Sequence, residues 1–241
     1  MNQALVLTFA AAACVAATPA VADDCAYHAQ REAALDAGGV RSVRIEAGAG
    51  ELRVEGRTGQ TRVEATGTAC ASGEPMLDHI RLTATRLGDV IVVKAEIPEG
   101  SLWSWNDTGR LDMVVTVPRI LPLEIEDGSG SATIAHVGPV RIRDGSGELT
   151  VTDVVGDVRI EDGSGSIEVE KVTGNVRLSD GSGGITVREV GGSVTVDEDG
   201  SGGIDVAGVK GDFTVARDGS GGIEHRDIAG QVRIPSDHRD R

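Results

Sequence analysis

The sequence predicts an all-β protein: a single-stranded parallel β-helix (solenoid) of about six coils, each of 17–19 residues, with an N-terminal β-rich capping region. Glycine accounts for 34 of the 241 residues and aromatic residues for only 2%, so a core must be built from thin aliphatic layers. One apolar pattern recurs in register through the second half, and self-similarity at a short period is typical of repeat architectures. The tetrapeptide Asp-Gly-Ser-Gly separates these repeats at steps of 17, 18, 18, 19 and 19 residues, starting at Asp127, Asp144, Asp162, Asp180, Asp199 and Asp218.

Residues 1–22 have the features of a signal peptide. Ala4 to Ala17 is apolar or small apart from Thr8, and Ala20-Val21-Ala22 places small residues before a cleavage site at Asp23. This run is shorter and richer in alanine than a spanning helix of about 20 residues, so we expect no membrane span in the mature chain. An ordinary buried helix is the alternative, as is lipidation at Cys14, although no large aliphatic residue stands three positions before that cysteine.

Export makes the remaining two cysteines informative. In an oxidising compartment, periplasm or cell surface, Cys25 and Cys70 are expected to form a disulfide that closes a loop of about 45 residues and contributes roughly 3–4 kcal/mol. Two buried free thiols are the alternative. Metal ligation is a weaker one, because neither cysteine has a second ligand at close spacing.

The net charge of −15 belongs to the mature chain, because the signal region has no charged side chain. This charge argues against nucleic acid and anionic membrane surfaces as partners. It favours solubility, and it is compatible with divalent cations or a basic partner.

Residues 23–122 form the predicted capping region. A short helix is expected around Ala26 to Asp36, ended by Gly38-Gly39. Strand-like pairs of apolar residues follow on both sides of Ala47-Gly48-Ala49-Gly50, which we interpret as a worn copy of the later tetrapeptide. The repeat therefore begins in this region.

Two further elements complete the cap. Ile80 to Thr85 and Val90 to Ala95 are separated by Leu87-Gly88-Asp89, a spacing that predicts a hairpin. Leu111 to Val117 predicts another strand, which ends before Pro118.

Residues 123–235 form the predicted repeat solenoid. The third full unit shows the pattern, with two apolar pairs of period two, each followed by glycine, at Ile167, Val169, Val172, Gly174, Val176 and Leu178. Such a unit predicts two short strands and two corners, and coils stacked about 4.8 Å apart with aliphatic ladders inside and Thr, Glu, Arg and Lys ladders outside. A β-sandwich or meander of the same strands is the alternative.

The chemistry of the tetrapeptide suits a corner. Glycine supplies a positive φ without steric cost, and the aspartate accepts a hydrogen bond from the backbone N–H two residues on. Both ends of the stack need capping. The disulfide-bearing segment is expected to cap one end. At the other end His225 takes an inward aliphatic position, Pro235 stops strand pairing, and residues 236–241 form a polar tail.

At these residues the chain resembles the bacterial putative-adhesin β-solenoid family. The features that carry the resemblance are the Asp-Gly-Ser-Gly turns, the Ile-x-Val-x-x-Val-x-Gly-x-Val-x-Val pattern and the exported N-terminus, over about residues 40–235. The resemblance implies a parallel β-helix, an envelope or extracellular location and no known enzymatic role. It transfers no binding residue to this chain.

The aspartates of the six turns would lie about 5 Å apart in a stacked solenoid, where neighbouring charges repel by roughly 0.8 kcal/mol even in water. Turn hydrogen bonds, the nearby Arg143 and Arg217, or bound cations would offset this repulsion. Calcium binding in the manner of a β-roll is one alternative. However, the β-roll nonapeptide is missing, and the second corner varies in residue type at Asp157, Asn175, Ser193 and Asp212.

Three further features of the sequence bear on catalysis and binding: the order of residues in the tetrapeptide, the histidines and the two tryptophans. Asp-Gly-Ser-Gly is not the order of a serine-nucleophile turn, and it lacks the third glycine and the helix of a phosphate cradle. The five histidines are scattered in the sequence. Trp103 and Trp105 are the possible partner contact, either as exposed aromatic faces or, alternatively, as indoles covering the core.

We therefore expect a non-catalytic exported envelope protein that acts as a binding, adhesin-like or structural surface. No cofactor or metal is expected, and the partner is an unidentified protein or polysaccharide, not nucleic acid. The alternatives are a calcium-binding β-roll-like module and a polysaccharide-acting β-helix enzyme, which would need an asymmetric cluster of acids and bases on one face.

Overall fold

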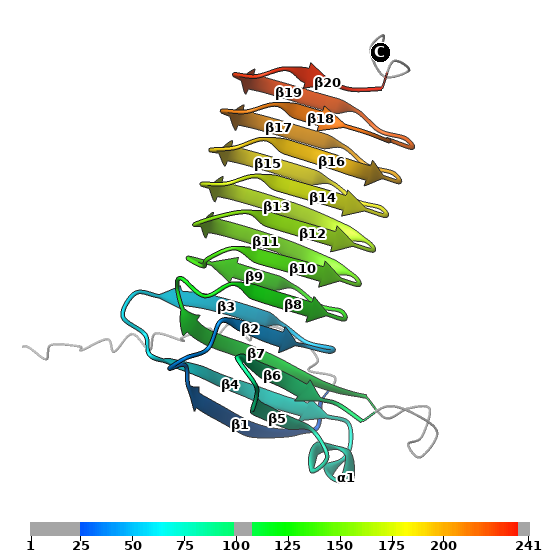
Figure 1. The fold of residues 1–241 in the computed structure, drawn as a ribbon. Helices are drawn as coiled ribbons and strands as arrows, with labels where there is room; N and C mark the ends of the chain where they lie inside the picture. The colour runs from blue at the N-terminus through cyan, green and yellow to red at the C-terminus, as the bar shows by residue number, and fades with distance from the viewer. Residues whose placement is uncertain (1–24, 99–107, 236–241) are drawn as a thin grey trace, which may run out of the picture.

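The computed structural model describes residues 25–98 and 108–235, and Figure 1 shows them as a flattened stack of coils with the N-terminal cap at one end. Each coil contributes one strand to each of two sheets that face one another. Both sheets contain ten strands.

The first sheet, sheet A, contains in spatial order β1 (Tyr27–Asp36), β4 (Arg62–Ala71), β7 (Gly109–Pro118), β3 (Leu52–Arg57), β9 (Ala132–Ala135), β11 (Gly147–Val154), β13 (Gly165–Val172), β15 (Ile185–Val190), β17 (Ile204–Val209) and β19 (Ile223–Ile228). The second, sheet B, contains β20 (Val232–Arg233), β18 (Phe213–Val215), β16 (Val194–Asp199), β14 (Val176–Asp180), β12 (Val158–Asp162), β10 (Val140–Asp144), β8 (Leu123–Asp127), β2 (Ser42–Glu46), β6 (Val90–Glu96) and β5 (Arg81–Leu87).

The repeat coils stack in parallel and in register. Ile142 lies opposite Ile160, which in turn lies opposite Leu178, and the other columns follow the same rule. The step of 19 residues from Asp180 to Asp199 is accommodated by a bulge between Leu178 and Ser179 in the pairing of β14 with β16. This parallel register confirms the predicted solenoid and excludes an antiparallel meander for the repeats.

The core lies between the two sheets and consists of the inward columns that the repeat pattern predicts. Within the described residues its members are buried and mostly aliphatic, with Phe213 as the one aromatic side chain among them. Because every strand alternates inward and outward residues, the polar side chains of the repeats form ladders on the outer faces.

A coil that is distant in sequence lies directly under the first repeat. Strand β2 pairs with β8, β3 pairs with β9, and Ala49 makes a bridge to Ser129. The Ala-Gly-Ala-Gly segment therefore occupies the corner position of a coil, which confirms its interpretation as a worn copy of the tetrapeptide. The next coil consists of β6 and β7, which pair in parallel with β2 and β3.

The cap changes to antiparallel pairing. Strand β4 pairs with β7, β1 pairs with β4, and β5 pairs with β6 as the predicted hairpin. A single helical turn, α1 (Glu74–Leu77), connects β4 to β5 and buries Met76 and Leu77 against the core.

The helix predicted around Ala26 to Asp36 is wrong, because this segment is strand β1. Its ten residues pair with β4 along their whole length, and Cys25 ties the start of the strand to Cys70. Ala29, Ala33 and Leu35 pack against the core at period two. A complete backbone ladder and this packing outweigh the helix propensity of an alanine-rich sequence.

The corner glycines are needed for two different reasons. Gly183, the last residue of its tetrapeptide, has φ 144°, and a Cβ there would lie 1.5 Å from the carbonyl oxygen of Gly165 one coil away. Gly181 does not have a positive φ, but its Cβ would lie 2.3 Å from the carbonyl oxygen of Gly163. Side chains rarely adopt the first conformation, and close stacking of the coils excludes a Cβ at both positions.

Candidate functional site

The aspartates of the tetrapeptides form a continuous column along one edge of the core. Each lies opposite the next, from Asp127 paired with Asp144 to Asp199 paired with Asp218. The first five are buried, with exposed fractions of 8, 6, 8, 3 and 1%. The carboxylates therefore face the interior, and the serines of the same turns lie at the surface or half-buried.

The turns do not satisfy their own polar groups as predicted. Only the Asp180 carboxylate accepts a bond from the amide two residues on, Ser182, at 3.1 Å, whereas Asp127 accepts from Gly128 at 2.9 Å. Among the described residues, neither carboxylate oxygen of Asp144, Asp162 or Asp199 has a hydrogen-bond partner of normal geometry. The corner amides instead donate to carbonyls of the neighbouring coil, as Gly147 does to Ser164.

This environment favours the protonated carboxyl groups. Burial, followed by repulsion from Asp144, raises the pKa of Asp127 to about 6. Burial likewise raises the pKa of Asp144 and of Asp180 to about 6, and it raises the pKa of Asp162 and Asp199. The amides of Gly145 and Ser146 limit this rise at Asp144 without making hydrogen bonds of normal geometry.

The arginines that were expected to neutralise this column lie elsewhere. Arg143 forms ion pairs with Glu126 and Glu161, both at 3.3 Å, and Arg217 pairs with Glu198 at 2.6 Å. All of these side chains are on the outer face, because they alternate with the inward residues. Within residues 25–98 and 108–235, no group of three or more His, Cys, Asp or Glu side chains is arranged to hold a metal ion.

The second corner uses side chains in another way. The Asp157 carboxylate accepts a bond from the amide of Asn175 at 2.7 Å, and the Asn175 side-chain oxygen accepts one from Ser193 at 2.9 Å. Ser193 and Asp212 continue the series toward the C-terminus. Any short side chain with an acceptor oxygen fulfils this role, which explains why Asp, Asn and Ser alternate there.

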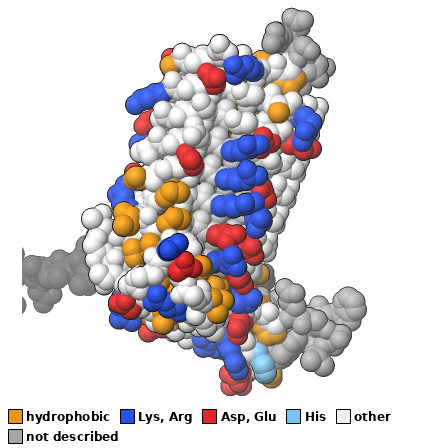
Figure 2. Space-filling view, viewed as in Figure 1, with side chains coloured by type: hydrophobic (Ala, Val, Ile, Leu, Met, Phe, Trp, Pro, Cys, Tyr) orange, Lys and Arg blue, Asp and Glu red, His pale blue; other side chains and the backbone are white. Residues whose placement is uncertain are grey.

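An arginine ladder crosses the outer face of sheet B. Arg141, Arg159 and Arg177 follow one another on β10, β12 and β14, in register. Figure 2 shows this column of basic side chains over the middle of the solenoid. At the strand spacing of about 4.8 Å the three guanidinium groups form a regular row on a flat surface.

Acidic residues hold this arginine ladder in place. Glu161 accepts from Arg141 at 2.9 Å and from Arg159 at 3.1 Å, and Asp197 pairs with Arg177 at 2.5 Å. The pKa of Glu161 is lowered, chiefly by its hydrogen bond from Arg159. Each arginine side chain remains about half-exposed, and its exposed N–H groups are open to a ligand, although the Nε of Arg141 is buried.

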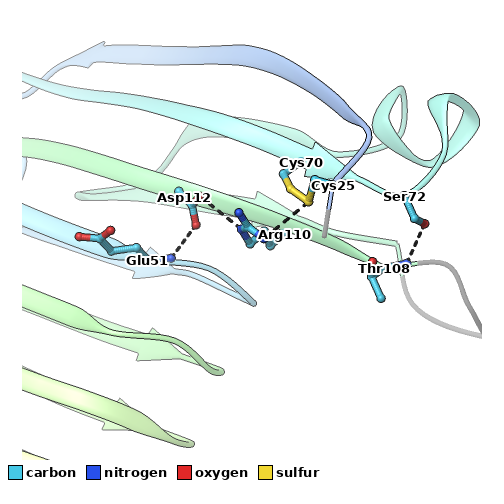
Figure 3. The surroundings of a disulfide bond; sticks show 7 residues. All are labelled: Cys25, Glu51, Cys70, Ser72, Thr108, Arg110 and Asp112. Atoms are coloured by element: carbon cyan, nitrogen blue, oxygen red, sulfur yellow. Dashed lines mark hydrogen bonds and ion pairs between the residues drawn. A yellow bond between two sulfur atoms is a disulfide. The ribbon is translucent and has the colours of Figure 1, made fainter. Parts of the chain in front are cut away.

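The predicted disulfide joins Cys25 to Cys70, whose Cα atoms lie 5.5 Å apart (Figure 3). The Arg110 guanidinium donates to the Cys25 sulfur at 3.6 Å and contacts Asp112, which accepts a bond from the Glu51 amide at 2.9 Å. These contacts attach the cap to the solenoid.

Trp103 and Trp105, the predicted partner contact, lie outside the described residues. Pro98 and Thr108 are the described residues on either side of this segment. These two flanking residues line a groove of about 990 Å³, together with residues such as Glu46, Lys94, Ile97 and Ser129. The groove lies where the coil of β6 and β7 has no tetrapeptide corner.

Two histidines occupy informative places. His136 and Asp153 are equivalent residues of adjacent coils, both with positive φ, and the His136 Nδ1 lies 2.6 Å from the Asp153 carboxylate. His225 lies on the last strand of sheet A, opposite Val206, as expected for an end coil. Sequence analysis did not single out the arginine ladder or the His136–Asp153 pair. The recurring Val-Arg-Ile and Val-Arg-Leu motifs were the available signal for the ladder.

Several solved structures are similar to this chain. Solved structures similar to this chain include a putative cell adhesion protein from Clostridium sporogenes (12% identity, 86% of this chain and 99% of that chain, TM-score 0.35). A putative adhesin from Bacteroides fragilis is similar at 16% identity (87% and 98%, TM-score 0.35). A putative lipid binding protein from Parabacteroides distasonis is similar at 12% identity (87% and 98%, TM-score 0.43).

The putative adhesins that the sequence resembles are thus also found among similar solved structures. No protein-family model matches the chain, and no curated protein matches it. In the part of the chain that the structure describes, none of the helices has the length and apolar character needed to cross a membrane.

Proposed function

We propose that this protein is a non-catalytic exported envelope protein whose outer faces serve as a binding, adhesin-like or structural surface. The observation that carries the proposal is the arginine ladder of Arg141, Arg159 and Arg177 on the flat outer face of sheet B. An extended acidic polysaccharide is the partner that this surface fits best, and an extended acidic protein segment is the other candidate.

The geometry supports a polymeric partner more than a small one. Guanidinium groups are planar, always charged, and bind carboxylates through paired hydrogen bonds. Their row at about 4.8 Å spacing offers repeated, equivalent contacts, and several weak contacts along one chain add up. Glu161 and Asp197 restrict the arginine side chains, so binding loses less conformational entropy than it would for free side chains.

Trp103 and Trp105 are the proposed second contact. In the sequence they lie between Pro98 and Thr108, which both line the groove, and aromatic rings offer flat faces to sugars. Export is supported by the signal-like residues 1–22 and by the Cys25–Cys70 disulfide, which is typical of oxidising compartments. We place the protein in the periplasm or at the cell surface.

A non-catalytic role is supported by the regularity of the repeat. The His136–Asp153 pair joins equivalent positions of adjacent coils and so continues the repeat rather than interrupting it. The buried aspartates also occur once per coil, whereas a catalytic centre needs unlike groups at one place.

The test is direct binding of the mature chain to polygalacturonate, with neutral dextran as the uncharged comparison. We expect Arg159→Ala/Arg177→Ala to weaken polygalacturonate binding at least tenfold. The matched control is Arg53→Ala/Arg188→Ala on the outer face of sheet A, which should leave binding unchanged. We expect Trp103→Ala/Trp105→Ala to weaken polygalacturonate binding as well, which would identify the second contact. Equal losses in both arginine double variants, or no binding at low salt, would contradict the proposal.

A further inference from the structure

The two ends of the solenoid are finished differently (Figure 1). At the N-terminal end, the Arg31 guanidinium of β1 donates to the carbonyls of Ile80 at 2.8 Å and Leu77 at 2.9 Å, and so joins the edges of the two sheets. As do the terminal strands β1 and β5 of the N-terminal end, β19 and β20 pair on one side only within the described residues, with β17 and β18 respectively. Their outer edges present backbone N–H and C=O groups that are free to pair with another strand.

The last coil also leaves the top of the core uncovered. Val209, Ile204 and Phe213 are fully buried, but the residues that follow them in the same columns, Ile228, Ile223 and Val232, are half-exposed. His225 replaces the buried Val206 of its column and lies over the ring of Phe213, at a centroid distance of 6.0 Å. We call this surface of β19 and β20 the C-terminal end face.

The C-terminal end face is electrically balanced, unlike the rest of the chain. The whole protein has a net charge of −15, but residues 223–235 contain two acids and two arginines: Glu224, Asp227, Arg226 and Arg233. Two copies that meet at this face therefore avoid the repulsion that opposes contact elsewhere.

Glu224 and Arg226 differ in their ion pairing within their own chain. Arg226 pairs with Asp205 at 3.0 Å. Glu224 lies opposite Asp205, a residue of like charge, and it forms no ion pair with any other described residue. A basic residue placed on the open side of β19 would relieve this repulsion.

We propose that the C-terminal end face binds a second copy of this chain, with the two β19 strands pairing antiparallel about a two-fold axis. An axis perpendicular to both sheets places sheet A on sheet A and sheet B on sheet B, so that the two cores become continuous. The register follows from the sequence. With His225 opposite its symmetry mate, Glu224 faces Arg226 of the other copy twice.

Other registers are unfavourable. A shift of one residue sets inward residues against outward ones, because side chains alternate along a strand. A shift to the next allowed register places Glu224 opposite Glu224, or Arg226 opposite Arg226, and like charges directly opposite one another are destabilising. The charge pattern of β19 is therefore complementary to itself in one arrangement.

This contact closes as a dimer. A two-fold contact uses the same surface on both copies, and each dimer then presents two N-terminal caps that the Arg31 contacts have already closed. The contact surface is narrow, so a dissociation constant on the order of 10 µM is expected.

The experiment measures self-association of residues 23–241 by sedimentation velocity from 1 to 200 µM. The wild type is expected to change from monomer to dimer in this range. Glu224→Arg alone and Arg226→Glu alone should each weaken dimerisation at least tenfold. An equimolar mixture of these two variants should restore it, because each arginine of one chain then faces a glutamate of the other. The double variant Glu224→Arg/Arg226→Glu should also dimerise, and the restored association in the mixture shows that the single variants are folded.

Two further variants test where the contact lies and whether the C-terminal tail affects it. Glu168 lies in the same outward column as Glu224, but at the middle of the solenoid. Glu168→Arg should therefore leave dimerisation unchanged. A chain ending at Pro235 tests whether the C-terminal tail covers the end face. The proposal is overturned if the wild type stays monomeric, or if dimers form only after removal of residues 236–241. It is also overturned if the mixture of the two charge variants does not associate.

Discussion

The two corners of each coil both turn the chain from one sheet to the other, but they do so with different residues. The Asp-Gly-Ser-Gly corner repeats almost unchanged, since the carbonyl of the neighbouring coil leaves no room for a Cβ at either glycine. At the second corner one glycine is retained, as at Gly192, and the next residue is Asp, Asn or Ser because only an acceptor oxygen is needed. Backbone contacts thus demand one residue type, whereas a side-chain hydrogen bond accepts several.

The Asp-Gly-Ser-Gly corner also contains the buried carboxyl groups that oppose folding. Its aspartates are buried with few hydrogen bonds, while the paired acceptors of the second corner are exposed or half-buried. Burial of unpaired carboxylates opposes folding at neutral pH. The comparison between the two corners can be tested in four ways.

The largest effect is expected from alanine at the tight corner. Gly183→Ala combines a positive φ with a clash against Gly165 and should destabilise the fold by about 4 kcal/mol or prevent folding. The adjacent Gly184 has open space around its Cβ position and no positive φ, so Gly184→Ala should change the free energy of unfolding by less than about 1 kcal/mol. Urea unfolding compares the two variants. Similar losses in both would show that stacking of the coils is not the reason for the glycine.

The aspartate column predicts a dependence of stability on pH. Because the folded state raises the pKa of Asp144 from 3.8 to about 6, it binds more protons than the unfolded state between these values. The contribution of this group to stability is therefore most favourable below pH 4, and it falls as the pH rises through about 6. Asp144→Asn should stabilise the protein by about 1 kcal/mol at pH 7.5 and lose this advantage at pH 4.

The matched control for this substitution is Asp157→Asn at the second corner, which keeps its acceptor oxygen and should have little effect at either pH. Unfolding free energies at pH 4.0 and 7.5 provide the measurement. A stability gain of Asp144→Asn that grows toward acidic pH would contradict the assignment of a raised pKa.

A smaller effect is expected from the second corner. Asn175→Ala removes the acceptor of the Ser193 amide and should destabilise the protein by about 1 kcal/mol. Asn175→Asp and Asn175→Ser retain an acceptor and should be nearly neutral. If all three variants lose the same stability, the side-chain oxygen is not the reason for the residue types found there.

The smallest effect concerns residues with positive φ at the second corner. Lys171 has φ 59°, and glycine adopts this conformation without the steric cost that other residues have. Lys171→Gly should stabilise the fold by about 0.5 kcal/mol, after the loss of its exposed contact with Glu170. Thermal unfolding would show a small rise in the midpoint. A fall of several degrees would mean that the lysine side chain has a role of its own.

The sequence by itself determined the repeat solenoid. Glycine spacing, period-two aliphatic pairs and the tetrapeptide are local features, and each coil repeats the same contacts, so one unit predicts the next. The worn corner at Ala47–Gly50 was predicted for the same reason, whereas the disulfide followed from the cysteine count and the β5–β6 hairpin from the turn between its strands. The arginine ladder was also present in the repeated motifs, but an exposed polar position has no strong pattern to distinguish it.

Tertiary structure alone decided the features that depend on distant neighbours. Strand β1 is extended because β4 offers it a complete ladder, and no local signal could outweigh its alanine content. Residues 42–57 stack under a coil that begins about 80 residues later, which nothing in their own sequence specifies. The inward direction of the aspartates was likewise set by the stacking, because a corner side chain turns toward the core or the solvent according to the coils above and below it.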